Sequence, residues 1–348
     1  MAKYQEIYQN LRLAILRGEY APDQQLPSEN ALSLKYGVSR ITSKHALNKL
    51  EANGLIYRIQ GKGSFVKSHS GIASRKLLLV LPFAGDLDLG NYLSGIQKTL
   101  IGTSWQLLSM QNDAFLRLDV NKLIKEYAGI IYYPQNIASE LPYLLKLFLA
   151  KKPLVLLDKG LEHLGIPSVT SDNNYGGQIA VEHLANQGLQ RIAFFAKTPF
   201  WEDFSGTVSA RFFGYLNAYR TFCDNKSTPL AWTKQLATLH GKQLVSYLKE
   251  NKIQALIVEN DIVAVKLAIE LKKNGLQIPT DIALVGFDNL TMAQLFDPPL
   301  TSIGQDFYEL GQHAVDLLLT QINNPARLLN EHQTVPIKLV ARKSTLKE

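Results

Sequence analysis

From Lys76 onward the chain alternates short apolar runs with amphipathic stretches for more than two hundred residues. Runs such as Lys76–Leu81 and Ala255–Val258 have the near-continuous hydrophobicity of strands that are buried on both faces of a sheet. Stretches such as Gly206–Phe222 carry the helical spacing of apolar residues instead. Strands and helices in turn predict parallel sheets joined by right-handed crossovers. Because this region is too long for one compact unit, we expect two doubly wound lobes.

The first 66 residues show a different pattern, which indicates short helices followed by a hairpin. We predict helices over residues 3–17, 29–36 and 39–53. Gly37 can adopt the left-handed conformation that ends one helix, and Ser39 can cap the next. Two helices joined by a tight turn that contains Gly form the helix-turn-helix pattern. The alternation on either side of residues 61–63 (Gly-Lys-Gly) predicts a two-stranded wing.

The first turn of the predicted 39–53 helix is rich in hydrogen-bond donors, namely Ser39, Arg40, Thr42 and Lys44. Donors of this kind contact phosphates and base edges in DNA. Each residue taken singly also fits an ordinary solvated helix face, where most surface charges occur. The Gly-Lys-Gly tip likewise fits any hairpin. Only the combination at this spacing favours DNA binding.

The charge of the chain is distributed unevenly. Residues 1–70 hold 10 Lys/Arg and 5 Asp/Glu, a net charge of +5, whereas residues 71–348 hold 27 and 25. A basic excess confined to one module is typical of a nucleic-acid-binding domain. Cys223 is the only cysteine, which excludes an intrachain disulfide and fits a reducing compartment. We recognise no signal peptide and no membrane-spanning segment, so we expect a cytoplasmic protein.

Residues 3–67 resemble the winged-helix DNA-binding domain of the GntR family of bacterial transcription regulators. The resemblance has no gap and rests on short motifs that are specific in combination. These motifs are Gly18-Glu19-Tyr20-Ala21-Pro22, Leu26-Pro27-Ser28-Glu29, Gly37-Val38-Ser39-Arg40, Ala46-Leu47, Gly54-Leu55-Ile56 and Gln60-Gly61-Lys62-Gly63.

The resemblance implies DNA contacts at the positions that match the family's pattern, which are Glu29, Asn30, Arg40, Lys44, Gln60 and Gly61. The expected DNA-binding set also includes Lys3, Ser39, Ile41, Thr42 and Lys62. Glu29 is alternatively a first-turn acid favoured by the helix dipole. Lys44 stands where the family usually has Arg, so we expect a point charge rather than a bidentate reader of guanine. Ser43 replaces the usual Val or Leu, which should weaken packing under the helix.

Residues 75–342 resemble the effector-binding domain of LacI/GalR-type repressors, which shares the fold of periplasmic sugar-binding proteins. The most specific matches are the runs PLVLLD (153–158), SVTSDN (168–173), PTDIALVGFD (279–288) and PPLTSI (298–303). The expected fold class is therefore α/β. We expect a winged helix-turn-helix domain over 1–67, a linker over 68–75, and a two-lobed periplasmic-binding-protein-like domain with parallel sheets over 76–342.

In that family a sugar lies between the lobes at the carboxyl ends of the strands, where open parallel sheets bind ligands in general. Asp, Asn and Arg side chains bind its hydroxyls, and an aromatic ring can stack on it. The matching positions, each expected at a strand end or the start of the next helix, are Asp158, Arg211, Asn260 and Asp288, with Phe83 and Tyr92 as aromatic contacts. Asp158 and Asp288 fit helix caps or hinge residues equally well. Tyr92 fits the hydrophobic core better.

Enzyme signatures are missing from the sequence. There is no GxxxxGK[ST], HExxH or GxSxG motif. The pairs Glu162-His163 and Glu182-His183 lack partners at metal-ligand spacing, and His183 is expected to be structural. We therefore expect no metal and no cofactor. The aspartates also fit hydrolysis of a sugar by two carboxylates, but the resemblance explains them better.

These observations favour a transcription regulator, a repressor of carbohydrate-utilisation genes, whose binding to double-stranded operator DNA is controlled by a small sugar effector. One winged helix makes too few contacts for specific affinity, so we expect a homodimer on a palindromic operator. The alternatives are a sugar-modifying enzyme and a solute-binding protein, each with a DNA-binding head. The second lacks the expected signal peptide.

Overall fold

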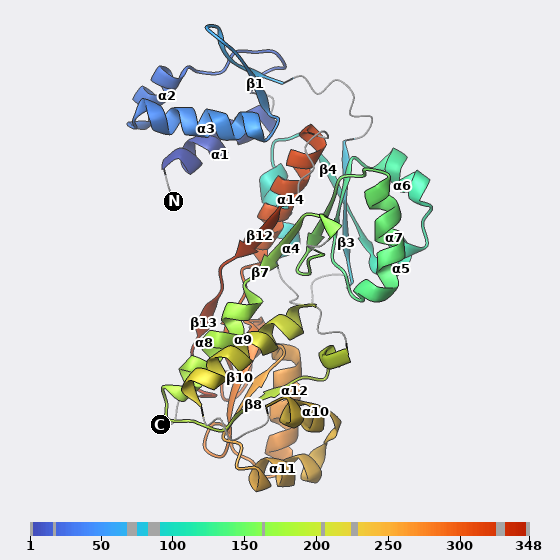
Figure 1. Cartoon of the computed structure of the whole chain (residues 1–348), viewed down its shortest axis with the longest axis vertical. Helices are drawn as coiled ribbons and strands as arrows, with labels where there is room; N and C mark the ends of the chain where they lie inside the picture. Colours follow the sequence, from blue (N-terminus) through green and yellow to red (C-terminus); the bar gives the residue numbers. More distant parts are fainter. Residues whose placement is uncertain are drawn as a thin grey trace. The chain divides into compact units, whose positions relative to one another are not determined.

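The structure, a computed structural model, describes residues 3–16, 19–67, 75–82, 91–161, 164–202, 206–223, 229–324 and 331–345 (Figure 1). These residues form two compact units. The first runs to Val169 and resumes over Tyr308–Gln333, and the second comprises Thr170–Phe307 together with the residues from Thr334. None of the described helices is long and apolar enough to cross a membrane.

The N-terminal head contains three helices and a hairpin, as the sequence predicts. The helices are α1 (Lys3–Leu16), α2 (Glu29–Tyr36) and α3 (Arg40–Ala52), and the antiparallel strands are β1 (Ile56–Ile59) and β2 (Gly63–Val66). The side chain of Ser28 accepts a hydrogen bond from the Ala31 amide, and that of Ser39 accepts one from Thr42, so α2 and α3 both start at a capping serine. Gly37 ends α2 with φ of +61°, a conformation that costs glycine little.

The head packs on a small apolar core that its helices and wing share. The buried side chains are Ile7, Tyr8, Leu11, Ile15, Leu26, Leu32, Ala46, Leu47, Leu50, Leu55, Ile56 and Val66. Ser43 lies on the same face of α3 and is fully buried, yet its hydroxyl has no hydrogen-bond partner among the described residues. Weaker packing beneath α3 stays a prediction, whereas the structure shows a buried unpaired hydroxyl at this position.

The first unit also contains a six-stranded sheet of order β12-β7-β6-β5-β3-β4. Its strands are β3 (Lys76–Leu81), β4 (Gln106–Gln111), β5 (Gly129–Tyr132), β6 (Leu154–Leu157), β7 (Ser168–Ser171) and β12 (His332–Val335). The pairs from β4 through β3, β5 and β6 to β7 are all parallel. The helices of this region are α4 (Tyr92–Leu100), α5 (Asn112–Leu116), α6 (Val120–Glu126), α7 (Ile137–Leu149) and α14 (Phe307–Asn323).

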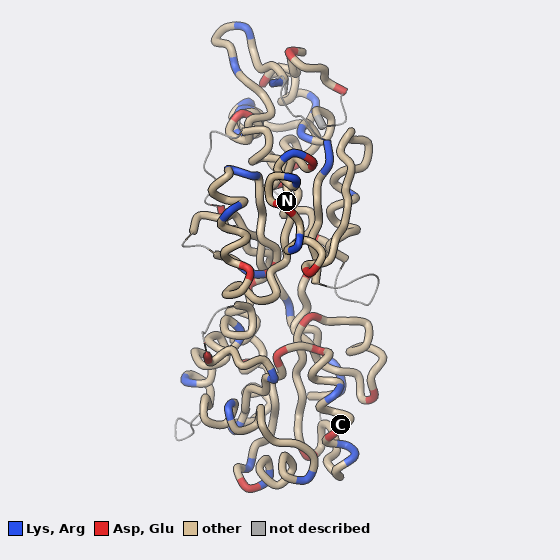
Figure 2. Tube along the Cα trace, turned by 90° about the vertical axis from the view of Figure 1, so that its right-hand side faces the viewer, with Lys and Arg blue, Asp and Glu red and all other residues tan. Residues whose placement is uncertain are grey.

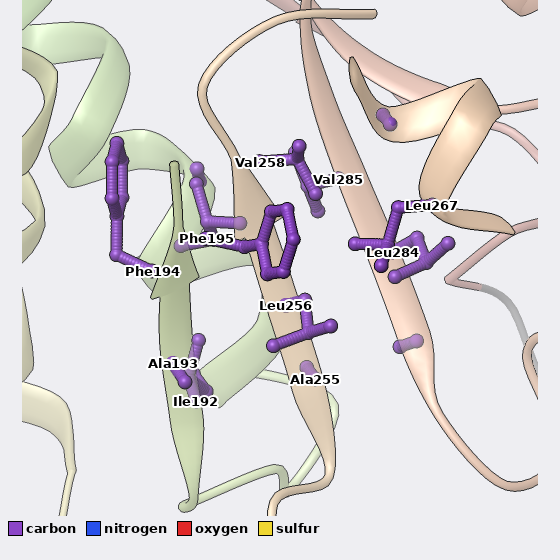
Figure 3. Close-up of a cluster of buried hydrophobic side chains, with 14 of the residues drawn as sticks. Ile192, Ala193, Phe194, Phe195, Ala255, Leu256, Val258, Leu267, Leu284 and Val285 are labelled. Carbon is purple, nitrogen blue, oxygen red and sulfur yellow. The ribbon is translucent and has the colours of Figure 1, made fainter. Parts of the chain in front are cut away.

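The second unit is built on a five-stranded sheet of order β13-β11-β10-β9-β8. Its strands are β8 (Ile192–Phe195), β9 (Ala255–Val258), β10 (Ala283–Asp288), β11 (Thr301–Gly304) and β13 (Lys338–Val340), and β13 alone among them pairs antiparallel. The core strands β8 and β9 are buried at every position, so apolar side chains fill both faces of the sheet (Figure 3). Fully buried strands of this kind explain the continuous apolar runs in the sequence.

Helices flank this second sheet. They are α8 (Asn173–Ala185), the short 3₁₀ helix η2 (Phe200–Glu202), α9 (Gly206–Phe222), α10 (Pro229–Thr238), α11 (Gly241–Glu250), α12 (Asp261–Lys273) and α13 (Thr291–Leu295). A Cβ at Gly177 would overlap the carbonyl oxygen of Arg211, and one at Gly214 would overlap that of Asn174. Two glycines thus let α8 and α9 pack backbone to backbone, which brings the start of α8 close to Arg211.

Asp261, at the start of α12, is fully buried and holds the turn after β10. It accepts hydrogen bonds from the Ser302 hydroxyl at 2.7 Å and from the Leu290 amide at 2.8 Å. A Cβ at Gly286 would overlap the Asp261 carboxylate, so glycine at that position makes room for it. Burial, and secondarily the charge of Asp288, raises the pKa of Asp261 to about 7.

The fold class and most elements predicted from the sequence are confirmed, including α2, α9 and β9 with their predicted bounds. Helix α8 begins at Asn173 because the Asp172 side chain caps it by accepting a hydrogen bond from the Tyr175 amide. Helices α7, α10 and α14 were not predicted. The expected linker over 68–75 lies, apart from Arg75, outside the described residues.

Replacing Ser43 with alanine removes the buried unpaired hydroxyl without adding volume. Because such a group has lost its water without gaining a partner, Ser43→Ala should stabilise the head by about 1 kcal/mol. Slower hydrogen–deuterium exchange of the α3 amides in the full chain would report this gain.

Ser33→Ala is the matched control, since the Ser33 hydroxyl donates to the Val38 carbonyl at 2.6 Å. Its loss should make exchange faster. Equal acceleration by both substitutions would show that the Ser43 hydroxyl is bonded in solution.

The raised pKa of Asp261 makes the stability of the second unit depend on pH. A carboxyl whose pKa is higher in the folded state contributes stability that is complete below its ordinary value near 3.8 and is lost as the pH rises through about 7. Raising the pH from 6 to 8.5 should therefore lower the free energy of unfolding of the parent by about 1.4 kcal/mol more than that of Asp261→Asn. Denaturant unfolding followed by tryptophan fluorescence measures the difference. Asp297→Asn, whose side chain is 96% exposed, should behave like the parent, and a parent curve parallel to that of Asp261→Asn would refute this account.

Candidate functional site

The carboxylate of Glu29 joins three elements of the head. One oxygen accepts from Arg40 Nε of α3 at 2.9 Å, and the other accepts from an Arg58 guanidinium nitrogen of β1 at 2.6 Å. These hydrogen bonds, that from Arg40 first, hold the pKa of Glu29 below its ordinary value. The start of α2, the start of α3 and the wing are thereby fixed relative to one another.

Most of the predicted DNA contacts lie on the exposed surface of these three elements. Those that are exposed to solvent are Lys3, Asn30, Ser39, Arg40, Ile41, Lys44, Gln60, Gly61 and Lys62, while Glu29 and Thr42 are partly buried. Ile41 is 80% exposed beside Arg40, and an exposed apolar side chain there can meet a thymine methyl group. Lys3 stands apart from the others, at the start of α1, and pairs with Glu6.

Arg58 belongs to this surface but was missed by the sequence analysis. Besides Glu29 it donates to the Asn48 side chain of α3 at 2.6 Å. Arg58 lies in β1, shortly before the Gly-Lys-Gly tip, and none of the family motifs includes its position. Lys and Arg positions recur along the whole head, including the hairpin (Figure 2). The surface is suited to a polyanion and presents donors and one apolar group for base edges.

A second cluster of polar side chains surrounds Arg211 in the second unit. Arg211 is only 4% exposed. Its guanidinium donates to the Asn173 side chain at 2.8 Å, to the Glu259 carbonyl, and to the Asp288 carboxylate at 3.3 Å. It also lies 3.8 Å from the centre of the Phe287 ring. A buried charge requires such pairing, so this cluster is a fixed, polar patch at the carboxyl ends of β9 and β10.

The sequence analysis placed Arg211 at a strand end or at the start of the next helix. It lies within α9 rather than at a strand end, and reaches the strand ends because its side chain is long and α9 packs closely on α8. Its side chain and that of Asp288 belong to one unit and are in direct contact.

Asp288 adopts a backbone conformation that non-glycine residues rarely use. Its φ is +103°, and that of the following Asn289 is +56°. Strain of this kind persists where the surrounding structure imposes it, and it concentrates at functional sites. Gln305, which the sequence analysis missed, donates to Asp288 at 2.6 Å, and its own amide oxygen is buried with no partner among the described residues.

Asn260 caps α12, as its side chain accepts from the Val263 amide at 2.8 Å. It follows β9 and therefore lies at the same edge of the sheet as Asp288. The cap occupies its side-chain oxygen, so any ligand contact falls to its amide group. Its predicted place at the start of a helix is confirmed, whereas its role stays a prediction.

Asp158 follows β6 in the first unit and also has a left-handed backbone, with φ of +69°. It is 4% exposed and accepts from the Tyr133 hydroxyl at 2.8 Å. Tyr92 is buried and meets Tyr133 edge to face, with ring centres 6.3 Å apart. This packing fits the interpretation of Tyr92 as a residue of the hydrophobic core. Phe83 lies outside the described residues.

Among the residues that the structure describes, no group of three or more His, Cys, Asp and Glu side chains is arranged to hold a metal ion. His183 lies 2.8 Å from the Thr345 hydroxyl, and burial lowers its pKa, which fits the structural role expected of it. Glu162 and His163 lie outside the described ranges.

Comparison with known families finds two matches along the chain. Residues 3–66 match the model described as bacterial regulatory proteins of the gntR family, and residues 181–345 match that of a periplasmic binding protein-like domain. A LacI family transcriptional regulator from Enterococcus faecalis V583, solved with bound ribose, superimposes with a TM-score of 0.62 at 24% identity. The match covers 78% of this chain and 100% of that one, and at this identity it shows the fold alone.

Two relatives extend the similarity over most of the chain. The arabinose metabolism transcriptional repressor of Geobacillus stearothermophilus is 28% identical over 340 residues, which cover 92% of each protein. The transcriptional repressor CytR of Escherichia coli is 27% identical over 316 residues, or 84% of this chain and 88% of CytR. The chain therefore carries a GntR-type regulatory domain followed by a periplasmic-binding-protein-like domain with the fold of LacI-family regulators.

Proposed function

We propose that this chain is a transcriptional repressor of carbohydrate-utilisation genes whose operator binding is controlled by a sugar. The observation that carries the proposal is the presence of both parts on one chain. A basic winged helix-turn-helix head precedes two parallel sheets whose carboxyl edges carry buried Asp and Arg side chains. The relative from Geobacillus stearothermophilus, a repressor of arabinose metabolism, spans both parts.

The proposed DNA interface is the surface that Glu29 organises. The start of α3 enters the major groove, where Arg40 and Ile41 reach base edges, while Lys44 and the wing residues 60–62 contact phosphates. Glu29 aligns Arg40 rather than binding DNA alone, because its carboxylate is already bonded to two guanidinium groups. The proposed boundaries follow the sequence: a DNA-binding domain over 1–67, a linker over 68–75, and an effector domain over 76–342.

The proposed effector contacts are the residues expected from the sequence. Asp158 in the first unit, and Arg211, Asn260 and Asp288 in the second, offer acceptors and donors that match sugar hydroxyls. Phe83 and Tyr92 remain the proposed aromatic contacts. Buried, preorganised polar groups of this kind give specificity, because a ligand that lacks the matching hydroxyl leaves one of them unpaired.

Two copies of the chain would read a palindromic operator. One small head contacts too few phosphates and bases for specific affinity, and two-fold related heads double that number. A sugar that prefers one arrangement of the effector domain shifts the population toward it and thereby changes DNA affinity by the same coupling free energy. Such a protein acts in the cytoplasm, where the operator is, and needs no catalytic activity and no cofactor.

Arg40 provides the first test of this function. Arg40→Ala should weaken binding to a duplex selected from a randomised DNA pool by about 1–3 kcal/mol, since a base or phosphate contact is lost. Fluorescence anisotropy of the labelled duplex, without sugar, measures the change.

Arg117→Ala is the matched control, because Arg117 is an exposed arginine outside the head. It should bind DNA as the parent does. Equal affinities of the Arg40 variant and the parent would remove Arg40 from the DNA interface.

Asp288 tests the effector contacts. A sugar hydroxyl left without its buried partner costs about 1–3 kcal/mol, so Asp288→Ala should weaken sugar binding by about one to two orders of magnitude. Titration calorimetry with pentoses measures it, and operator affinity without sugar should stay that of the parent. A changed sugar-free DNA affinity would identify Asp288 as a hinge residue instead.

Asp281→Ala serves as the control for Asp288. Asp281 lies just before β10, at the opposite end of the strand, where it accepts from the Gln277 amide. Its loss should leave the sugar affinity unchanged. If both aspartate variants bind the sugar as the parent does, the effector does not contact this edge of the sheet.

A further inference from the structure

Tyr133 follows β5 directly, and Asp158 follows the neighbouring parallel strand β6. Because parallel neighbours end at the same edge of a sheet, the two residues meet there. The Tyr133 hydroxyl donates to Asp158 Oδ2 at 2.8 Å. This contact determines which way the carboxylate faces, and no sequence motif indicated it.

The other oxygen of Asp158 is buried and has no hydrogen-bond partner within the part of the chain that the structure describes. The residue as a whole is 4% exposed. A buried acceptor that stays unpaired is costly, and its backbone conformation, with φ of +69°, adds strain. An acceptor held in this way is suited to a donor that arrives with a ligand.

The segment that carries Tyr133 is itself held by buried polar groups. Glu140, which is 3% exposed, accepts from the Gln135 amide at 3.2 Å and from the Asn136 amide at 3.0 Å. Asn112 donates to the Tyr133 carbonyl at 2.9 Å, and Lys159 donates to the Gln135 carbonyl at 2.7 Å. The Tyr133 hydroxyl is therefore presented by a preorganised loop, which is the arrangement that precise ligand contacts need.

We propose that Tyr133 is a positioning residue of the effector site. Its hydroxyl occupies Asp158 Oδ2, so that Oδ1 is left to accept a hydrogen bond from a hydroxyl group of the effector. This inference rests on the proposed function and deepens it by naming the ligand chemistry. A fully ionised phosphate or carboxylate cannot donate to Oδ1, so the group that reaches Asp158 is a hydroxyl of the sugar.

Tyr133→Phe removes the hydroxyl and keeps the ring that packs on Tyr92. It should weaken the binding of D-ribose, L-arabinose or D-xylose, whichever binds the parent, by about tenfold in titration calorimetry. Tyr143→Phe is the matched control. The Tyr143 hydroxyl also donates hydrogen bonds in the first unit, but to the Phe115 and Leu118 carbonyls rather than to Asp158. Its loss should therefore leave the sugar affinity unchanged.

A double-mutant cycle separates positioning from general loosening of the fold. If Tyr133 acts through Asp158, Tyr133→Phe should change sugar affinity by less than about twofold in an Asp158→Ala background. Full additivity of the two substitutions, or parent-like affinity of Tyr133→Phe alone, overturns the inference while leaving the proposed function in place. A parent that binds neither these pentoses nor any of a panel of hexoses contradicts the sugar-controlled function and this inference with it.

Discussion

The buried guanidinium of Arg211 is the constraint on which the second unit depends. A charge that has left water must be paired, because breaking one partner of such a group typically costs several kcal/mol. Arg211 meets that demand with partners from α8, from the residue after β9 and from the end of β10. The partners are therefore held at fixed separations. Glycines at 177 and 214 make the arrangement accessible, since any side chain there would push α9 away from α8.

A comparable cluster of charged side chains organises the head, with a carboxylate rather than a guanidinium at its centre. The Glu29 carboxylate pairs with two arginines, Arg40 of α3 and Arg58 of the wing strand β1. In both places one ionised side chain joins three elements that are distant in sequence. The geometry of each proposed contact surface therefore follows from satisfying a single charge. These charge clusters say more about function than the overall fold does, because proteins of many different functions share the fold.

Local signals in the sequence were sufficient for much of the fold. Ser28 and Gly37 fix both ends of α2, and the apolar run Ala255–Val258 gives β9. Helix α7 escaped prediction because Pro142 lies inside it, and proline normally ends or bends a helix. The candidate sites were harder to predict from the sequence. Arg58, Gln305 and Tyr133 acquire their roles from partners 29, 17 and 25 residues away, and no local pattern reports a pairing at such separations.

The most direct test of sugar-controlled DNA binding is operator affinity measured as a function of sugar. A labelled duplex, selected from a randomised pool by the full-length protein, is titrated in fluorescence anisotropy with and without each of a panel of pentoses and hexoses. The sugar that binds the protein in calorimetry should change operator affinity by at least about fivefold, the lower end of typical coupling between linked sites. A sugar that binds tightly while operator affinity stays the same would contradict the account.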